Sequence, residues 1–191
     1  IGYICTRVSG FYFLMITLAF SQMIYAIVHQ WFDLTGGTNG LSGIPKPSLF
    51  GDVVLHSSTS IYYLILLIFL LVYFGLKPFV WSPFGQTLIG IKENEARMLA
   101  AGYNTSLYKT ISFIIAGTLG GLAGCLYTYF NGFVSPGDVY WTVSAQGLIM
   151  VLIGGAGTLF GPVLGAAFIV ILETVVSSYT ELWMMFIGII F

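Results

Sequence analysis

Long uncharged runs of apolar residues alternate with shorter polar segments along this chain. Residues 11–28, 61–76 and 111–130 each form such a run, and each approaches the roughly 20 residues that a helix needs to cross a bilayer. A fourth apolar run covers residues 146–172. The pattern predicts an all-α fold, a polytopic transmembrane helical bundle.

The fourth run is too long and too rich in glycine for one regular helix. It would extend about 40 Å at 1.5 Å per residue, against a hydrocarbon core of about 30 Å. Gly154, Gly155, Gly157 and Gly161-Pro162 interrupt it. Broken or re-entrant half-helices fit this sequence, and transporters often line substrate paths with them, so Gly154, Gly155 and Gly157 are translocation-path candidates. The alternative is that the glycines only allow helices to pack closely.

Two further candidates for the translocation path lie near the first run. Gln22 lies within that run, where it is either an interhelical hydrogen-bond partner or a path residue. The polar segment 33–60 is too rich in glycine and proline for a spanning helix. Its residues Gly36, Gly37 and Asn39 form either a nest of backbone N–H groups for a substrate carboxylate or an ordinary tight turn.

Charged residues are rare, at 7% of the chain, and the basic ones concentrate in one loop. The loop 77–109 holds four of the six Lys and Arg residues, namely Lys77, Lys92, Arg97 and Lys109. Arg7 precedes the first run, and Lys46 lies in the segment 33–60. The positive-inside rule therefore places the loop 77–109 in the cytoplasm. The net charge of −1 and the lack of another basic patch give no reason to expect a nucleic-acid partner.

Within this loop, residues 86–101 predict one amphipathic helix that Gly102 ends. Glu93 and Arg97 are spaced for an ion pair on that helix. Its predicted apolar face consists of Leu88, Ile91, Met98 and Leu99. The helix is too short and too charged to cross a membrane, so it either lies on the bilayer surface or docks into a groove on a partner protein.

Four strings resemble the LivM-type permease of branched-chain amino-acid ABC importers. They are TLAFSQMIY (17–25), DLTGGTNGLSGIP (33–45), SPFGQTLIGIKENEARMLAAGYNTSLYK (82–109) and LIGGAGTLFGPVLGA (152–166). They follow the order of that family and span nearly the whole chain. The resemblance implies one transmembrane permease domain of the ABC importer type over residues 1–191. The chain begins with Ile and ends in an apolar run, so we expect an interior fragment, truncated at both ends.

The resemblance also implies that the loop 77–109 couples the permease to an ATPase subunit. The ATPase-coupling residues would be Ile91, Glu93, Asn94, Glu95, Met98 and Gly102. The general importer pattern is Glu-Ala-Ala followed three residues later by Gly. Glu95 and Ala96 match it, Arg97 replaces the second Ala, and Gly102 lies one residue too far.

The implied function is ATP-driven import of branched-chain amino acids across the plasma membrane of a bacterium or archaeon. The implied partners are cytoplasmic ATP-binding subunits, a second homologous permease subunit, an extracytoplasmic substrate-binding protein and the lipid bilayer. The chain has no Gly-Lys-Ser/Thr phosphate-binding motif, so we expect neither enzymatic activity nor a cofactor. The alternatives are a permease for urea or short amides and an ATP-independent channel or carrier.

Overall fold

The computed structural model describes residues 10–44, 48–49, 53–54 and 58–178. Arg7 and Lys46 lie outside these residues, so their predicted places are not tested. The chain divides into two compact units, Ile1–Val139 and Tyr140–Phe191, which we describe separately. The prediction of a single permease domain stays a prediction.

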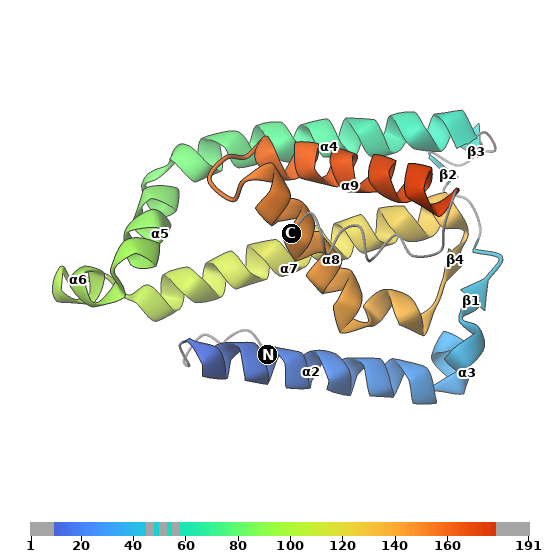
Figure 1. The fold of residues 1–191 in the computed structure, drawn as a ribbon, viewed down its shortest axis with the longest axis horizontal. Coiled ribbons are helices and arrows are strands. Elements are labelled where there is room, and N and C mark those ends of the chain that lie inside the picture. The colour runs from blue at the N-terminus through green and yellow to red at the C-terminus, as the bar shows by residue number, and fades with distance from the viewer. Residues whose placement is uncertain (1–9, 45–47, 50–52, 55–57, 179–191) are drawn as a thin grey trace. The chain divides into compact units, whose positions relative to one another are not determined.

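Three helices of the first unit are long and apolar enough to cross a membrane, judged by length and composition among the described residues. They are α2 (Phe11–Gln30), α4 (Ser58–Trp81) and α7 (Thr105–Asn131). Each contains one of the first three predicted spans. α4 and α7 lie side by side and run in opposite directions (Figure 1). The helical prediction is thereby confirmed for this unit.

The second helix extends beyond the predicted span of residues 61–76. α4 continues through Pro78 to Trp81. A proline removes one backbone hydrogen bond, but membrane helices tolerate it where local adjustments satisfy the backbone again. The third span also differs from the prediction, because α7 begins at Thr105 and therefore includes Lys109.

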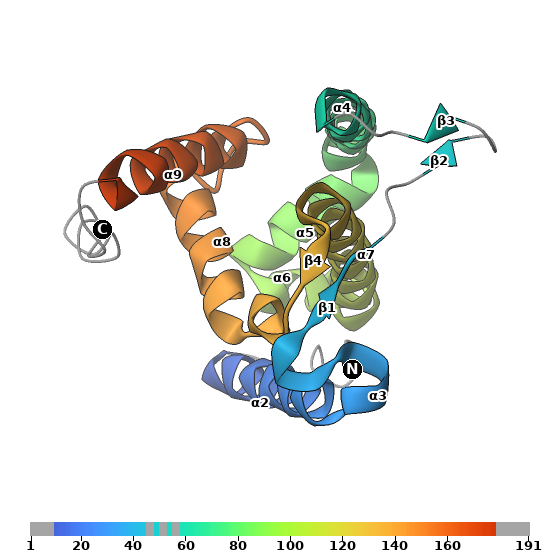
Figure 2. The same ribbon diagram turned by 90° about the vertical axis from the view of Figure 1, so that its right-hand side faces the viewer.

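Short irregular elements fill the polar segment after α2, as its glycines and prolines predict. They are α3 (Phe32–Thr35), η1 (Gly37–Asn39), β1 (Leu41–Ser42), and the antiparallel pair β2 (Ser48–Leu49) and β3 (Val53–Val54). β1 pairs in antiparallel register with β4 (Phe133–Val134), which follows α7. The link then ends in η2 (Pro136–Val139). The β1–β4 pair thus ties the end of α7 to the segment after α2 (Figure 2).

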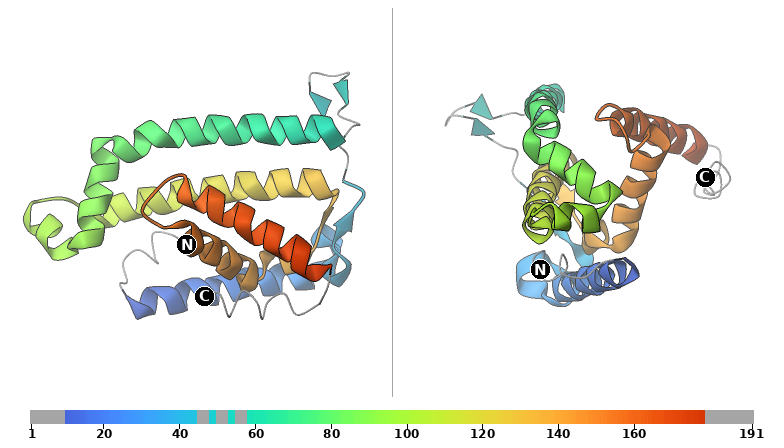
Figure 3. Two further views of the ribbon diagram at one scale, coloured as in Figure 1. Left: turned by 45° about the horizontal axis from the view of Figure 1, so that its top comes forward. Right: turned by 90° about the vertical axis from the view of Figure 1, so that its left-hand side faces the viewer.

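The second unit contains two shorter apolar helices, α8 (Trp141–Gly154) and α9 (Gly161–Ser177), joined by a bend (Figure 3). The prediction that residues 146–172 form two half-helices is therefore confirmed. The glycines also pack closely, since a Cβ on Gly154 would lie 1.9 Å from the carbonyl oxygen of Gly161. The two interpretations of this run do not exclude each other.

Few apolar side chains are buried within the described residues. Ile61, Ile91 and Ile169 are the buried hydrophobic residues of that part of the chain. Large side chains such as Leu67 and Leu71 are 59% and 66% exposed on α4. Apolar surface on this scale is typical of helices whose faces contact lipid or other protein rather than water.

Candidate functional site

The polar corner, residues 82–109, joins α4 to α7 through two short helices (Figure 1). Ser82 has an extended backbone, and its hydroxyl accepts a hydrogen bond from the Gly85 N–H at 3.4 Å. Pro83 occupies the first helical position, where the missing N–H has no partner to lose. The Ser-Pro sequence therefore ends α4 and starts α5 (Pro83–Glu93) within two residues.

Asn94 divides the helix predicted over residues 86–101, and that prediction is wrong. The Asn94 backbone is extended, with φ −157° and ψ 97°, and its side-chain oxygen accepts a hydrogen bond from the Arg97 N–H at 3.0 Å. Such a cap competes with continuation of the preceding helix, so α6 (Glu95–Ala100) starts anew. The predicted Glu93–Arg97 ion pair is wrong too, because that spacing works only within one continuous helix and the salt bridge found in the described residues has other partners.

The predicted apolar face of this helix is dispersed by the break. α6 packs back against α5, since a Cβ on Gly90 would lie 2.9 Å from the sulfur of Met98. Ile91 is buried, and Leu88 and Met98 are half-buried. Leu99, in contrast, is 54% exposed. Most of the predicted stripe therefore stabilises the corner itself, and only Leu99 is well placed for a partner.

Gly102 ends α6, as predicted. Its φ of +88° lies in the left-handed region that favours glycine. Its N–H donates to the carbonyl of Leu99 at 3.0 Å, and the N–H of Tyr103 donates to that of Met98 at 3.1 Å. These bonds satisfy carbonyl groups at the end of α6. Asn104 then caps α7 with its side-chain oxygen, so a turn of a few residues joins the two helices.

Glu95 connects α6 to the first turns of α7. Its Oε1 accepts a hydrogen bond from the Thr105 hydroxyl at 3.1 Å and forms an ion pair with the Lys109 Nζ at 2.5 Å. The bond from Lys109 holds the pKa of Glu95 below its ordinary value, against the opposing effect of burial and with help from Thr105. The carboxylate is thus ionised at neutral pH. Its contribution to stability is lost only as the pH falls through this lowered pKa.

Aromatic side chains of the polar corner pack against α4 and against the start of α7. The ring of Phe84 in α5 lies 5.1 Å from that of Phe79 in α4, measured between centroids. It also stacks on Tyr108 in α7 at 5.1 Å, with 25° between the ring planes. Tyr103 meets Tyr108 edge to face at 6.2 Å. Such pairs contribute about 0.5–1.5 kcal/mol each beyond their buried area, so the corner is a folded junction.

The exposed surface of the corner mixes apolar and charged side chains. The exposed apolar ones are Ile89, Leu99, Tyr103 and Leu107. The exposed charged ones are Lys92, Glu93 and Arg97. An exposed surface that combines apolar and charged side chains is typical of a protein-binding surface.

The six predicted coupling residues have different places in this corner. Glu93 is exposed, Ile91 and Met98 pack inside, Asn94 caps α6, Glu95 binds α7, and Gly102 forms the turn. Sequence reasoning missed Thr105 and Lys109 as partners of Glu95. They follow it by ten and fourteen residues, and no local periodicity links side chains across an intervening turn.

The segment Gly36, Gly37 and Asn39 forms a tight turn in the structure. The N–H groups of Gly36 and Asn39 donate to the carbonyls of Phe32 and Gly36, and the Gly37 N–H donates to the Thr35 hydroxyl. These donors are engaged within the segment, which favours the turn over the anion nest. Gly37 also packs under an aromatic ring, because a Cβ there would lie 2.4 Å from Phe32.

The other path candidates belong to α2 and to the bend between α8 and α9. Gln22 is half-buried in α2. Gly154 lies at the end of α8, Gly155 adopts a φ of +93° in the bend, and Gly157 has open space around its Cβ position. The bend is closed by a hydrogen bond from the Gly161 N–H to the Thr158 hydroxyl at 3.0 Å.

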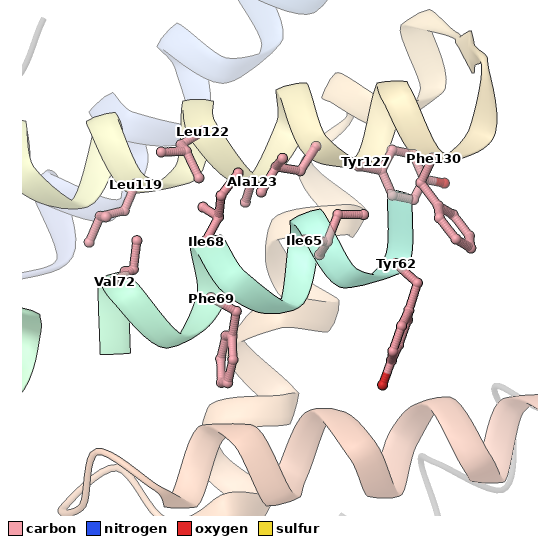
Figure 4. Close-up of a pocket in the computed structure, with 11 residues that line it drawn as sticks. Tyr62, Ile65, Ile68, Phe69, Val72, Leu119, Leu122, Ala123, Tyr127 and Phe130 are labelled. Carbon is pink, nitrogen blue, oxygen red and sulfur yellow. The ribbon is translucent and has the colours of Figure 1, made fainter. Parts of the chain in front are cut away.

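An apolar groove of about 480 Å³ runs between α4 and α7 (Figure 4). Ile65, Ile68 and Phe69 of α4 line it opposite Leu119 and Leu122 of α7. It has no charged side chain in its lining. An amino-acid zwitterion needs partners for both of its charges, so the groove suits a hydrocarbon chain or an apolar helix instead.

Comparison with known proteins identifies the family of this chain. The profile of the branched-chain amino acid transport system / permease component family matches residues 1–191. The high-affinity branched-chain amino acid transport system permease protein LivM of Salmonella typhimurium is 27% identical over 98% of this chain and 49% of its own length. LivM of Escherichia coli gives the same values. A Methanocaldococcus jannaschii protein named "Probable branched-chain amino acid transport permease protein LivM" is 28% identical over 85% of the chain and 47% of its own length.

The chain thus spans about half the length of the curated relatives that it matches. No solved structure matches it. The family profile, however, covers the chain from end to end, including the long apolar helices, the polar corner and the bend between α8 and α9. The chain therefore belongs to the family of branched-chain amino acid transport system permease components.

Proposed function

We propose that this chain is part of the membrane-spanning permease subunit of an ATP-driven importer of branched-chain amino acids. The observation that carries the proposal is the family profile, which matches residues 1–191 without a gap in coverage. The names of the relatives specify branched-chain amino acids, which is why this substrate class is favoured over urea and short amides.

In this proposal the polar corner docks onto a cytoplasmic ATPase subunit. The four basic residues between Lys77 and Lys109 support a cytoplasmic position. Leu99, Tyr103 and Leu107 supply exposed apolar surface of the corner, and Glu93 supplies an exposed charge. Ile91, Met98 and Gly102 act indirectly, by holding the shape of the corner.

ATP hydrolysis then resides on the separate ATPase subunits, and their closure moves the corner as a lever. An extracytoplasmic binding protein delivers the amino acid, and a second homologous permease subunit completes the translocation path. The bend at Gly154, Gly155 and Gly157 is our candidate for a path-lining segment, because it is non-helical backbone between two apolar helices. Gln22 is a second candidate, and the turn at Gly36, Gly37 and Asn39 is a weaker one. The plasma membrane of a bacterium or archaeon is the proposed location.

Uptake into liposomes tests this function. The full-length permease is reconstituted with its second permease and its ATPase subunits, and radiolabelled leucine is supplied with the binding protein. We expect uptake that requires ATP and stops when the ATPase subunits are omitted, because the energy enters only through them. Urea and acetamide serve as competing substrates and should leave leucine uptake unchanged.

Two results would contradict the proposal. Leucine uptake that persists without the ATPase subunits would indicate a channel or carrier. ATP-dependent uptake of urea or acetamide without uptake of leucine would leave the importer class intact and replace the substrate.

A further inference from the structure

Two connections join α6 to α7 at the polar corner. One is the backbone turn at Gly102, closed by hydrogen bonds from Gly102 and Tyr103 to the end of α6. The other is the side chain of Glu95, which reaches across to Thr105 and Lys109. We propose that Glu95 and Lys109 form a strut that makes α6 and α7 move as one body. This inference rests on the proposed coupling function of the corner.

The residues of the strut lie in the first turns of α6 and α7. Glu95 is the first residue of α6, Thr105 is the first residue of α7, and Lys109 lies one turn further along α7. The carboxylate of Glu95 therefore sits against the N-terminal end of a 27-residue helix, where the helix dipole favours negative charge. With the backbone turn on one side and this strut on the other, α6 cannot swing about Gly102 without breaking a charged contact.

The joint between α5 and α6 is built differently. The extended backbone at Asn94 separates these helices, and Met98 packs against Gly90 across the joint without a charged contact. Side-chain packing of this kind can slide, whereas a short ion pair with a second hydrogen bond cannot do so without loss. The charged contact therefore gives α6 a directional link to α7, the long apolar helix, that its packing on α5 does not supply.

Glu95 is consequently a positioning residue rather than a contact to the ATPase. Its Oε1 already accepts two donors within the chain, and one of them, Thr105, is only 4% exposed. These two bonds hold the carboxylate toward the first turns of α7. Glu93 is exposed, and no salt bridge of the described residues includes it. It is the better placed carboxylate for a partner.

Exchanging the charges of Glu95 and Lys109 tests whether Glu95 positions α6 or contacts the ATPase. The variants Glu95→Lys, Lys109→Glu and the double exchange are reconstituted as full-length permease with the complete transporter. We expect each single variant to lower the stimulation of ATP hydrolysis by substrate-loaded binding protein about fivefold, a usual size for loss of coupling between sites. The double exchange should recover most of that stimulation, because it restores an opposite pair. A carboxylate that contacts the ATPase could not be rescued in this way.

Matched variants distinguish loss of the strut from loss of ATPase docking and from a general effect on folding. Leu99→Asp on the exposed surface should reduce co-purification of the ATPase, whereas the milder variants Glu95→Gln and Lys109→Gln should retain the ATPase and lose stimulation. Thr105→Val removes the hydroxyl donor and should weaken stimulation, whereas Thr118→Val removes a hydroxyl that donates only to its own helix and should not.

The outcomes distinguish the strut from the proposed function. If the unaltered permease fails to retain the ATPase, the docking role of the corner is wrong. If the ATPase is retained but the double exchange stays as impaired as the single variants, the strut is wrong and Glu95 acts on the partner. Unchanged stimulation in Glu95→Gln and Lys109→Gln would also overturn the strut.

Discussion

At the scale of single residues, two positions of the polar corner require glycine, each for a different structural reason. Gly102 needs its left-handed backbone and has open space where a Cβ would lie. Gly85 needs the absence of a side chain, because a Cβ would lie 2.1 Å from the carbonyl oxygen of Val80. The first role was predictable from a glycine that follows a helical pattern. The second was not, because it depends on how α5 folds back on the end of α4.

The variant Gly102→Ala tests the first role. Alanine in the left-handed region costs about 1–2 kcal/mol, so we expect a lower midpoint of thermal unfolding for the full-length permease in detergent. Gly75→Ala is the matched control, since Gly75 lies in α4 with open space around it. It should be neutral or slightly stabilising, by about 0.5–1 kcal/mol. Equal midpoints for the two variants would contradict the role of backbone strain at Gly102.

At the scale of elements, the bend between α8 and α9 shows how glycine decides packing. Gly161 and Gly154 approach each other so closely that a Cβ on either would lie within 2.5 Å of the carbonyl oxygen of the other. Gly165 packs one turn further on, against the carbonyl oxygen of Met150. In α7, the similarly spaced Gly117 and Gly121 meet nothing within 4 Å. The same spacing therefore predicts an interface in both helices, but the described structure contains the partner of only one.

The variant Gly165→Ala tests the contact between α8 and α9. Its Cβ would lie 1.9 Å from the Met150 carbonyl oxygen, so the helices must separate. Overpacking of this kind costs about 1–3 kcal/mol, so we expect a lower midpoint of thermal unfolding for the full-length permease. Gly147→Ala, in α8 with open space around it, serves as the control and should leave the midpoint nearly unchanged. An equal effect of both substitutions would argue against the packed bend.

At the scale of the whole molecule, the distribution of basic residues predicts the orientation in the membrane. The loop 77–109 carries Lys77, Lys92, Arg97 and Lys109, and a membrane protein keeps such loops in the cytoplasm. In the first unit, the polar corner and the β1–β4 pair lie at opposite ends of α7 (Figure 1). The turn at Gly36, which adjoins β1, is therefore expected on the external side.

Labelling of cysteines in intact cells tests this orientation. Thr38→Cys and Lys92→Cys are introduced separately after Cys5 and Cys125 are replaced by alanine; both target side chains are exposed. A membrane-impermeant maleimide should label the thiol at position 38 in intact cells, and the thiol at position 92 only after permeabilisation. The reverse pattern would place the polar corner outside and would exclude its docking to a cytoplasmic ATPase.

Local patterns of the chain were sufficient for its long apolar helices, its polar segments and the stop at Gly102. Each of these depends on neighbouring residues: the transfer of apolar runs into lipid, or the backbone freedom of one glycine. The ion pair of Glu95 with Lys109 and the contact of Gly165 with Met150 required the tertiary structure. They join segments according to where the folded chain places them, which no periodicity within one segment encodes.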